Sequence, residues 1–206
     1  MFDPLHLSSL IASRICHDLI SPIGAISNGV ELMMMDSAGA SGQEMALILE
    51  SAGHANARIR YFRVAFGLCA PDQRIGRGEV AAILADNAAG GRIAVTWDSP
   101  QDLARRDVKM AFLGLMCLET ALIQGGAVQI ALGDTGWQLT ARAPRIRRDP
   151  SLWDGLSSPA QAGAFYEGVA AGHVHFPLLA LEAARQHRAI ALAGGGEGAS
   201  EISLRF

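Results

Sequence analysis

The sequence is poor in cysteine, and the three cysteines it has lie far apart. Cys16, Cys69 and Cys117 are odd in number and too widely spaced for a disulfide framework or a zinc knuckle. We therefore expect neither feature, and we predict a protein of the cytoplasm.

Long apolar runs and an excess of positive charge are also missing. No run reaches the roughly 18 uninterrupted apolar residues of a membrane span, and Met1–Pro4 has no basic flank or apolar block of a signal peptide. The formal net charge of -3 differs from the strongly basic balance typical of nucleic-acid binding. Arg145, Arg147 and Arg148 form a small basic cluster, which we interpret as a solvated loop. We expect no membrane segment and no nucleic-acid partner.

The remaining composition is typical of a folded protein. Half of the 206 residues are apolar and 18% are charged, which supplies a core and gives no sign of disorder. The length exceeds that of one average domain, so we expect two. We predict a helical hairpin domain over 1–70, a linker rich in proline and glycine over 71–78, and an α/β domain over 79–206.

The first 70 residues predict an antiparallel pair of helices. Pro4 suits the first position of a helix, which should continue to about Asp36. Ser41 and Glu44 have the spacing of a capping box, from which a second helix should continue to about Gly67. Apolar residues recur every three or four positions along both helices. Two such helices cannot enclose a core, so we predict that two hairpins form a four-helix bundle in a homodimer.

The rest of the chain alternates between helical and extended patterns. We predict helices over 79–88, 107–124 and 173–187, a further helical region opened by Ser158 and Pro159, and strands over 92–98, 127–132, 137–143, 189–193 and 201–206. Gly133–Gly136 should form the turn of a hairpin. The expected fold class is α+β, a helical hairpin followed by an α/β sandwich domain.

His17 lies on the polar side of the first predicted helix. With residues about 100° apart, its side chain points roughly 160° away from the centre of the apolar stripe and therefore into solvent. Arg14, Ser21 and Gly24, with Asn28 further along, make its surroundings small and polar, so that a large partner can approach the imidazole. A solitary exposed histidine usually has no function, and the neighbouring residues therefore decide its interpretation.

The segment His17–Ile23 resembles the phosphoacceptor motif of sensor histidine kinases. That motif is a histidine, an acidic residue, an apolar residue, any residue, a threonine or similar residue, a proline and an apolar residue, and every defined position is met. A neutral imidazole offers a nucleophilic nitrogen near neutral pH, and an acidic neighbour can orient it and accept its proton. Asp18 is the candidate for that role, and an ordinary solvated carboxylate is the alternative. Ser21 can hold a water or a phosphoryl oxygen, and Arg14 can pair with the phosphoryl charge or an acidic partner.

The nucleotide-binding elements of a kinase are not recognisable. The helix expected over 107–124 holds no asparagine, and Glu119 stands where a metal-linked amide would be sought. Asp134–Gln138 reproduces only half of an Asp-x-Gly-x-Gly loop. Gly194–Gly198 is followed by no helix and contains no lysine, so we interpret it as a connection between terminal strands. We predict no nucleotide site and no metal site.

This combination resembles the ChpT-type histidine phosphotransferases, dimeric bacterial proteins with a kinase-like bundle and a degenerate histidine kinase ATP-binding domain. The resemblance covers essentially the whole chain and is most specific over Arg14–Asn28 and Ala57–Gly67. It implies that His17 carries a phosphoryl group between aspartates of receiver domains. The donor would be the receiver domain of a hybrid kinase of the CckA type, and the acceptors would be response regulators such as CtrA and CpdR.

The resemblance also implies where partners and ions belong. The chain would carry no cofactor, and the Mg²⁺ that assists transfer would belong to the receiver partner. Ile20 and Gly24 are candidates for contact with that receiver.

Three other functions stay open. An ATP-dependent histidine kinase would need a nucleotide loop that we do not recognise. A dimeric scaffold would use the hairpin and have no need of His17. A metal enzyme using His173 and His175 would need further ligands, because on the expected helix the two point about 160° apart and no nearby cysteine or carboxylate completes a set.

Overall fold

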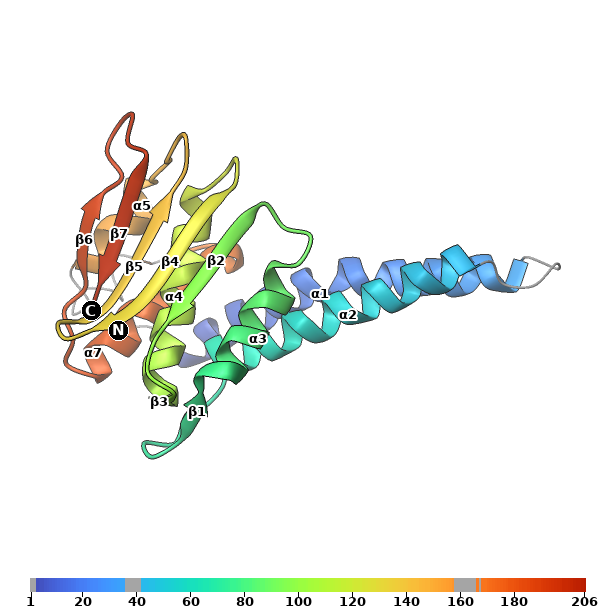
Figure 1. Ribbon diagram of the computed structural model, residues 1–206, viewed down its shortest axis with the longest axis horizontal. Coiled ribbons are helices and arrows are strands. Elements are labelled where there is room, and N and C mark those ends of the chain that lie inside the picture. The colour runs from blue at the N-terminus through green and yellow to red at the C-terminus, as the bar shows by residue number, and fades with distance from the viewer. Residues whose placement is uncertain (1–2, 36–41, 158–165, 167) are drawn as a thin grey trace.

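The computed structural model describes residues 3–35, 42–157, 166 and 168–206 (Figure 1). The capping box that involves Ser41 and the helical region predicted to open at Ser158 and Pro159 therefore lie outside the described residues.

Two long helices form an arm that projects from the rest of the molecule (Figure 1). α1 spans Pro4–Met35 and α2 spans Gly42–Ala65, which confirms the predicted hairpin. The Asp3 carboxylate accepts a hydrogen bond from the Leu5 backbone N–H at 3.0 Å and so caps the start of α1. The helices approach closely at Gly29, where an added Cβ would lie only 2.7 Å from Ile48 Cγ1. No helix in the described part of the chain is long and apolar enough to cross a membrane.

The second part of the chain is built on a mixed five-stranded sheet with the order β2-β4-β5-β7-β6. The strands are β2 Ile93–Asp98, β4 Gly126–Gly133, β5 Gly136–Arg142, β6 Ala191–Gly194 and β7 Glu201–Arg205. β2 and β4 are parallel, and the other neighbours are antiparallel. β4 and β5 form the predicted hairpin, in which Gly136 has a φ of 106° that other residues rarely adopt. The sheet strands match the predicted ones in order.

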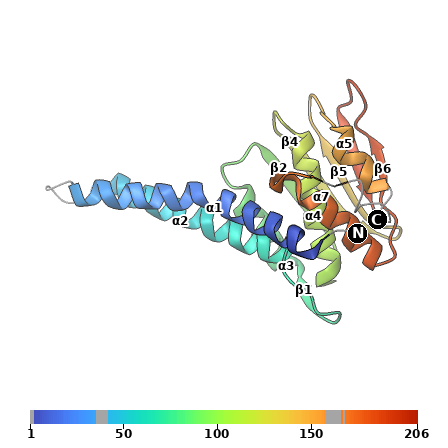
Figure 2. The same cartoon turned by 180° about the vertical axis from the view of Figure 1, so that it is seen from behind.

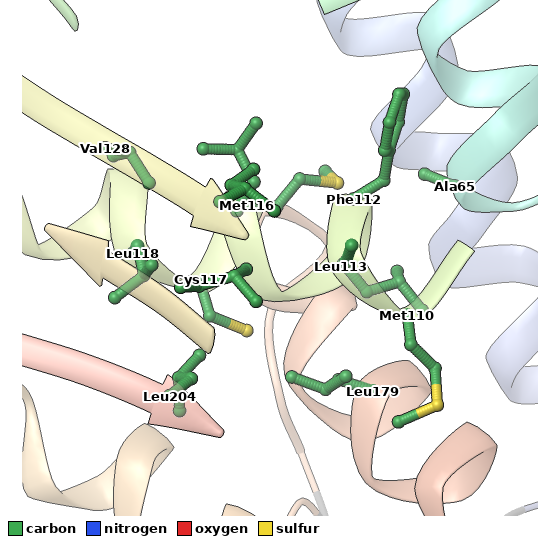
Figure 3. Packing of buried hydrophobic residues seen from close by; sticks show 14 of the residues in the cluster. Ala65, Met110, Phe112, Leu113, Met116, Cys117, Leu118, Val128, Leu179 and Leu204 are labelled. Carbon is green, nitrogen blue, oxygen red and sulfur yellow. The ribbon is translucent and has the colours of Figure 1, made fainter. Parts of the chain in front are cut away.

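Helices cover one face of this sheet, as Figure 2 shows for α4 and α7. The helical segments are α3 Arg77–Ala88, α4 Arg105–Ala121, α5 Pro150–Trp153, α7 His175–Arg185 and the 3₁₀ turns Asp154–Ser157 and Ala171–His173. α4 is buried on nearly all sides, because the sheet covers one side and α2 and α7 cover others. In Figure 3 its side chains fill the space between Val128, Leu204 and Leu179, while Phe112 extends towards Ala65 of α2.

The segment 71–78, expected to be a linker, is mostly exposed but includes a short strand. It contains β1, Arg74–Gly76, which pairs antiparallel with β3, Asp102–Ala104, and Ile75 between them is buried. A strand of three residues has too little periodicity to be recognised, and its pairing depends on a segment far along the chain.

Basic residues of α4 join the arm to the second domain. Arg105 Nη1 donates to the Val64 carbonyl at 2.9 Å, and Lys109 Nζ donates to the Gly67 carbonyl at 3.0 Å. Carbonyls at a helix end have no partner within the helix, and they form its negative pole. Arg105 therefore satisfies the end of α2, Lys109 holds the backbone just beyond it, and both fix the arm to α4.

Candidate functional site

The structure places His17 on the open side of α1, as predicted. Its side chain is 85% exposed. Ile20 beside it is 69% exposed, and Ser21 and Asn28 are also exposed. Gly24 is half-buried, but a Cβ added there would meet nothing within 4 Å. The surface around the imidazole is therefore accessible to a large partner.

Asp18 contacts the imidazole of His17. His17 Nδ1 lies 3.1 Å from Asp18 Oδ1. An ionised carboxylate can only accept a hydrogen bond, so the hydrogen of the neutral ring belongs on Nδ1 in this contact. The other ring nitrogen, Nε2, then keeps its lone pair, which makes it a nucleophile on the exposed side chain.

Two guanidinium groups hold the other oxygen of this carboxylate. The Asp18 side chain is only 9% exposed, and its Oδ2 lies 3.0 Å from Arg14 Nη2 and 3.8 Å from Arg58 Nε. Neither contact has the alignment of a hydrogen bond, and within the described residues Oδ2 has no hydrogen-bond partner. The interaction is therefore mainly coulombic, and it compensates for the removal of the carboxylate from water.

Each of these arginines is held by the second domain. Arg14 Nη1 donates to the Gly172 carbonyl at 2.7 Å, and Arg58 Nη1 donates to Asn87 Oδ1 of α3 at 3.0 Å. The Arg58 guanidinium also lies over the Phe62 ring, 5.6 Å from its centroid. The sequence analysis named Arg14, but it missed Arg58, Asn87 and the Gly172 carbonyl.

A polar cleft of about 490 Å³ lies beside Asp18, between the arm and the end of α3. Ser21 lines it from α1, His54 and Arg58 line it from α2, and Asn87 lines it from α3. His54 of α2 thus faces this cleft. The cleft therefore reaches Asp18 and Arg58 from the side of α3.

Two further titratable groups lie close to the cluster. Burial raises the pKa of Glu119 on α4 to about 7, although the positive charges of Arg58 and Arg14 oppose the shift. Burial lowers the pKa of His175 to about 3, and the charges of Arg14 and His173 add to this. His175 is therefore neutral at physiological pH, and within the described residues neither ring nitrogen has a hydrogen-bond partner.

The structure also places the turn and the histidine pair that the sequence offered as kinase-like and metal-like patterns. Asp134 and Thr135 form the tight turn between β4 and β5, and Gly136 begins β5. The rings of His173 and His175 have centroids 6.3 Å apart. Among the described residues, no group of three or more histidines, cysteines, aspartates or glutamates is arranged to hold a metal ion.

An exposed imidazole in contact with a carboxylate thus lies on a helical hairpin that is joined to an α/β domain. Residues 77–198 match the family model described as the histidine phosphotransferase C-terminal domain. Protein phosphotransferase ChpT of Brucella abortus (strain 2308) is 33% identical over 154 residues, which are 72% of this chain and 73% of that protein. This chain belongs to the histidine phosphotransferase family, so the resemblance recognised in the sequence is confirmed.

A solved structure shares the fold. A bacterial phosphotransferase structure aligns with 100% of this chain and 98% of its own, at 29% identity and with a TM-score of 0.77. The histidine kinase AdeS of Acinetobacter baumannii is a weaker match, at 14% identity over 92% of this chain and 96% of its own, with a TM-score of 0.45.

Proposed function

We propose that this chain relays a phosphoryl group between aspartates of receiver domains through His17. The observation that carries the proposal is the contact between His17 Nδ1 and Asp18 on a side chain that is otherwise open to solvent. It leaves Nε2 exposed as the nucleophile. Membership of the histidine phosphotransferase family supports the same chemistry.

The transfer step follows from this geometry. The Nε2 lone pair attacks the phosphorus of an aspartyl phosphate, an N–P bond forms, and the P–O bond to the aspartate breaks, leaving its electron pair on the carboxylate. The Nδ1 hydrogen stays in its hydrogen bond to Asp18, whose negative charge stabilises the phosphorylated imidazolium. Attack by the aspartate of a second receiver reverses these changes. Mg²⁺ would be held by the receiver, not by this chain.

Residues around His17 would contact the receiver. Ile20 offers an apolar contact, Gly24 offers space, and Ser21 and Asn28 offer polar groups on the same exposed surface. By resemblance, the donor is the receiver domain of a hybrid kinase of the CckA type, and the acceptors are response regulators of the CtrA and CpdR type. Such an exchange would take place in the cytoplasm.

We also propose that the arm forms a homodimer. Large apolar side chains remain exposed along both helices of the single chain, and on α1 Ile23, Val30 and Met34 recur on one face. Met45 and Leu49 do the same on α2. Exposed apolar surface of this extent marks an interface, and a second hairpin with the same stripe would cover it as a four-helix bundle.

Transfer of radiolabel tests the function. The purified protein and its His17→Ala variant are mixed with a phosphorylated receiver domain, and ATP alone serves as a parallel donor. His6→Ala is the matched control, because His6 is exposed on the same helix, about 16 Å away along its axis. We expect label from the receiver on the wild type and the control but not on His17→Ala. Labelling by ATP alone would instead indicate a kinase, and no labelling from several receivers would indicate a scaffold.

A further inference from the structure

The two arginines beside Asp18 have a feature that the phosphotransfer chemistry alone does not require. In each guanidinium group, one nitrogen lies near the Asp18 carboxylate and another donates a hydrogen bond to the α/β domain. We propose that the α/β domain positions the phosphoacceptor: Asn87 holds Arg58, the Gly172 carbonyl holds Arg14, and both arginines hold the carboxylate that orients His17. This proposal rests on the function proposed above for His17.

Arg58 is the most informative part of this arrangement. Its guanidinium is fixed on three sides, by Asn87 Oδ1 at 3.0 Å, by the Phe62 ring at 5.6 Å and by Asp18 Oδ2 at 3.8 Å. The planar fork of arginine can make these contacts at once, whereas a lysine ammonium carries one compact charge. Arg58 does not contact His17 in this structure, so it acts through Asp18 as a positioning residue.

The physical consequence concerns the tautomer of His17. Asp18 is almost fully withdrawn from water, and its position depends on the cations around it. Asp18 has two arginine partners, and Arg58 is the one that lines the cleft. Without Arg58, the carboxylate loses that partner and can turn towards solvent. The His17 ring then loses its fixed acceptor, and its hydrogen is free to move to Nε2, the nitrogen that must attack. At metal sites, loss of the outer-shell partner that orients a histidine typically costs about tenfold to 100-fold in affinity or activity, and we expect a loss near the lower end here.

The chain offers a matched control for this proposal. Arg60 also lies on α2 and also pairs with α3, through Asp86 at 2.7 Å, but it has no contact with Asp18 among the described residues. Arg60→Gln therefore removes a tie between the same two helices without touching the cluster. This control therefore distinguishes an effect on the position of His17 from an effect of loosening the contact between α2 and α3.

The experiment uses the full chain with Arg58→Gln, Arg58→Lys, Asn87→Ala and Arg60→Gln. Long-range ¹H–¹⁵N correlation spectra of the free protein report the His17 tautomer, with the His17 signals identified by their loss in His17→Ala. The rate of phosphoryl transfer from a labelled receiver is measured in parallel, and circular dichroism checks folding. Asn87→Ala keeps the test valid if Arg58→Gln does not fold.

We expect Arg58→Gln to increase the share of the Nε2–H tautomer and to slow transfer about tenfold. Asn87→Ala and Arg58→Lys should have smaller effects in the same direction on the tautomer share and on the transfer rate. Arg60→Gln should change neither quantity. Slower transfer with an unchanged tautomer would overturn the proposal, because Arg58 would then act on the receiver directly from the cleft. Equal effects of Arg60→Gln would also overturn it. Labelling of His17→Ala would refute the proposed function instead, and the tautomer measurement would still stand.

Discussion

Replacing Glu119 by glutamine should stabilise this protein at alkaline pH. Burial raises the Glu119 pKa from 4.5 to about 7 even though Arg58 and Arg14 favour its charged form. Desolvation therefore outweighs two nearby guanidinium groups, and the folded state prefers the neutral acid. Because the folded pKa lies above the unfolded one, this stabilisation is complete below about pH 4.5 and is lost as pH rises through about 7.

The size of the effect follows from the same shift. A change from 4.5 to about 7, at about 1.4 kcal/mol per unit, gives an upper limit of roughly 3.5 kcal/mol. Glu119 keeps part of its surface exposed, and water there reduces the penalty, so we expect about 1–2 kcal/mol. Glutamine has nearly the same shape and no charge, and its contribution should not change with pH.

Urea unfolding near pH 5 and near pH 8.5, at one fixed protein concentration, measures this difference. His175 gives the protein a pH dependence of its own, because its pKa is lowered from 6.5 to about 3 and stability rises with pH between these values. That contribution is common to wild type and variant, and it cancels in their difference. Glu201→Gln, at an exposed glutamate paired with Arg142, is the control. If Glu119→Gln and wild type differ by the same free energy at both pH values, the reasoning is wrong.

Two further predictions concern the junction and the arm. Arg105→Met should lower the free energy of unfolding by about 3 kcal/mol, because it leaves carbonyls at the end of α2 without donors. Arg106→Met, at an exposed neighbour, is the control and should change this free energy by less than about 0.5 kcal/mol. Equal losses for the two variants in urea unfolding would contradict the role given to Arg105. Leu49→Glu, at a side chain 65% exposed on the arm, should weaken the proposed dimer at least about 100-fold in multi-angle light scattering. Ile123→Glu, at a side chain 53% exposed on the other domain, should not, and a dimer that survives Leu49→Glu would place the interface elsewhere.

The helical hairpin and the exposure of His17 could be predicted because both follow from short-range patterns. Apolar residues at helical spacing define one side of α1, and a residue opposite that side, such as His17, is expected to face solvent, as it does in the structure. The contact between His17 and Asp18 joins adjacent residues, so it too was open to prediction. The β4–β5 hairpin was predictable for the same reason, since its turn residues lie between two alternating segments.

The surroundings of Asp18 were decided at long range. Asn87 is 29 residues from Arg58, and Gly172 is 158 residues from Arg14. No periodicity or local preference relates such positions, because backbone propensity and side-chain spacing act over a few turns only. The packing of α3 and the turn Ala171–His173 against the arm brings these groups together.

The amino-acid order therefore specifies the nucleophile and its nearest partner, whereas tertiary packing decides how firmly that partner is held. A carboxylate that is only 9% exposed needs cations close to it to compensate for the loss of water. Here the cations are Arg14 of α1 and Arg58 of α2, and the second domain holds both of them. Only the assembled fold can supply that arrangement.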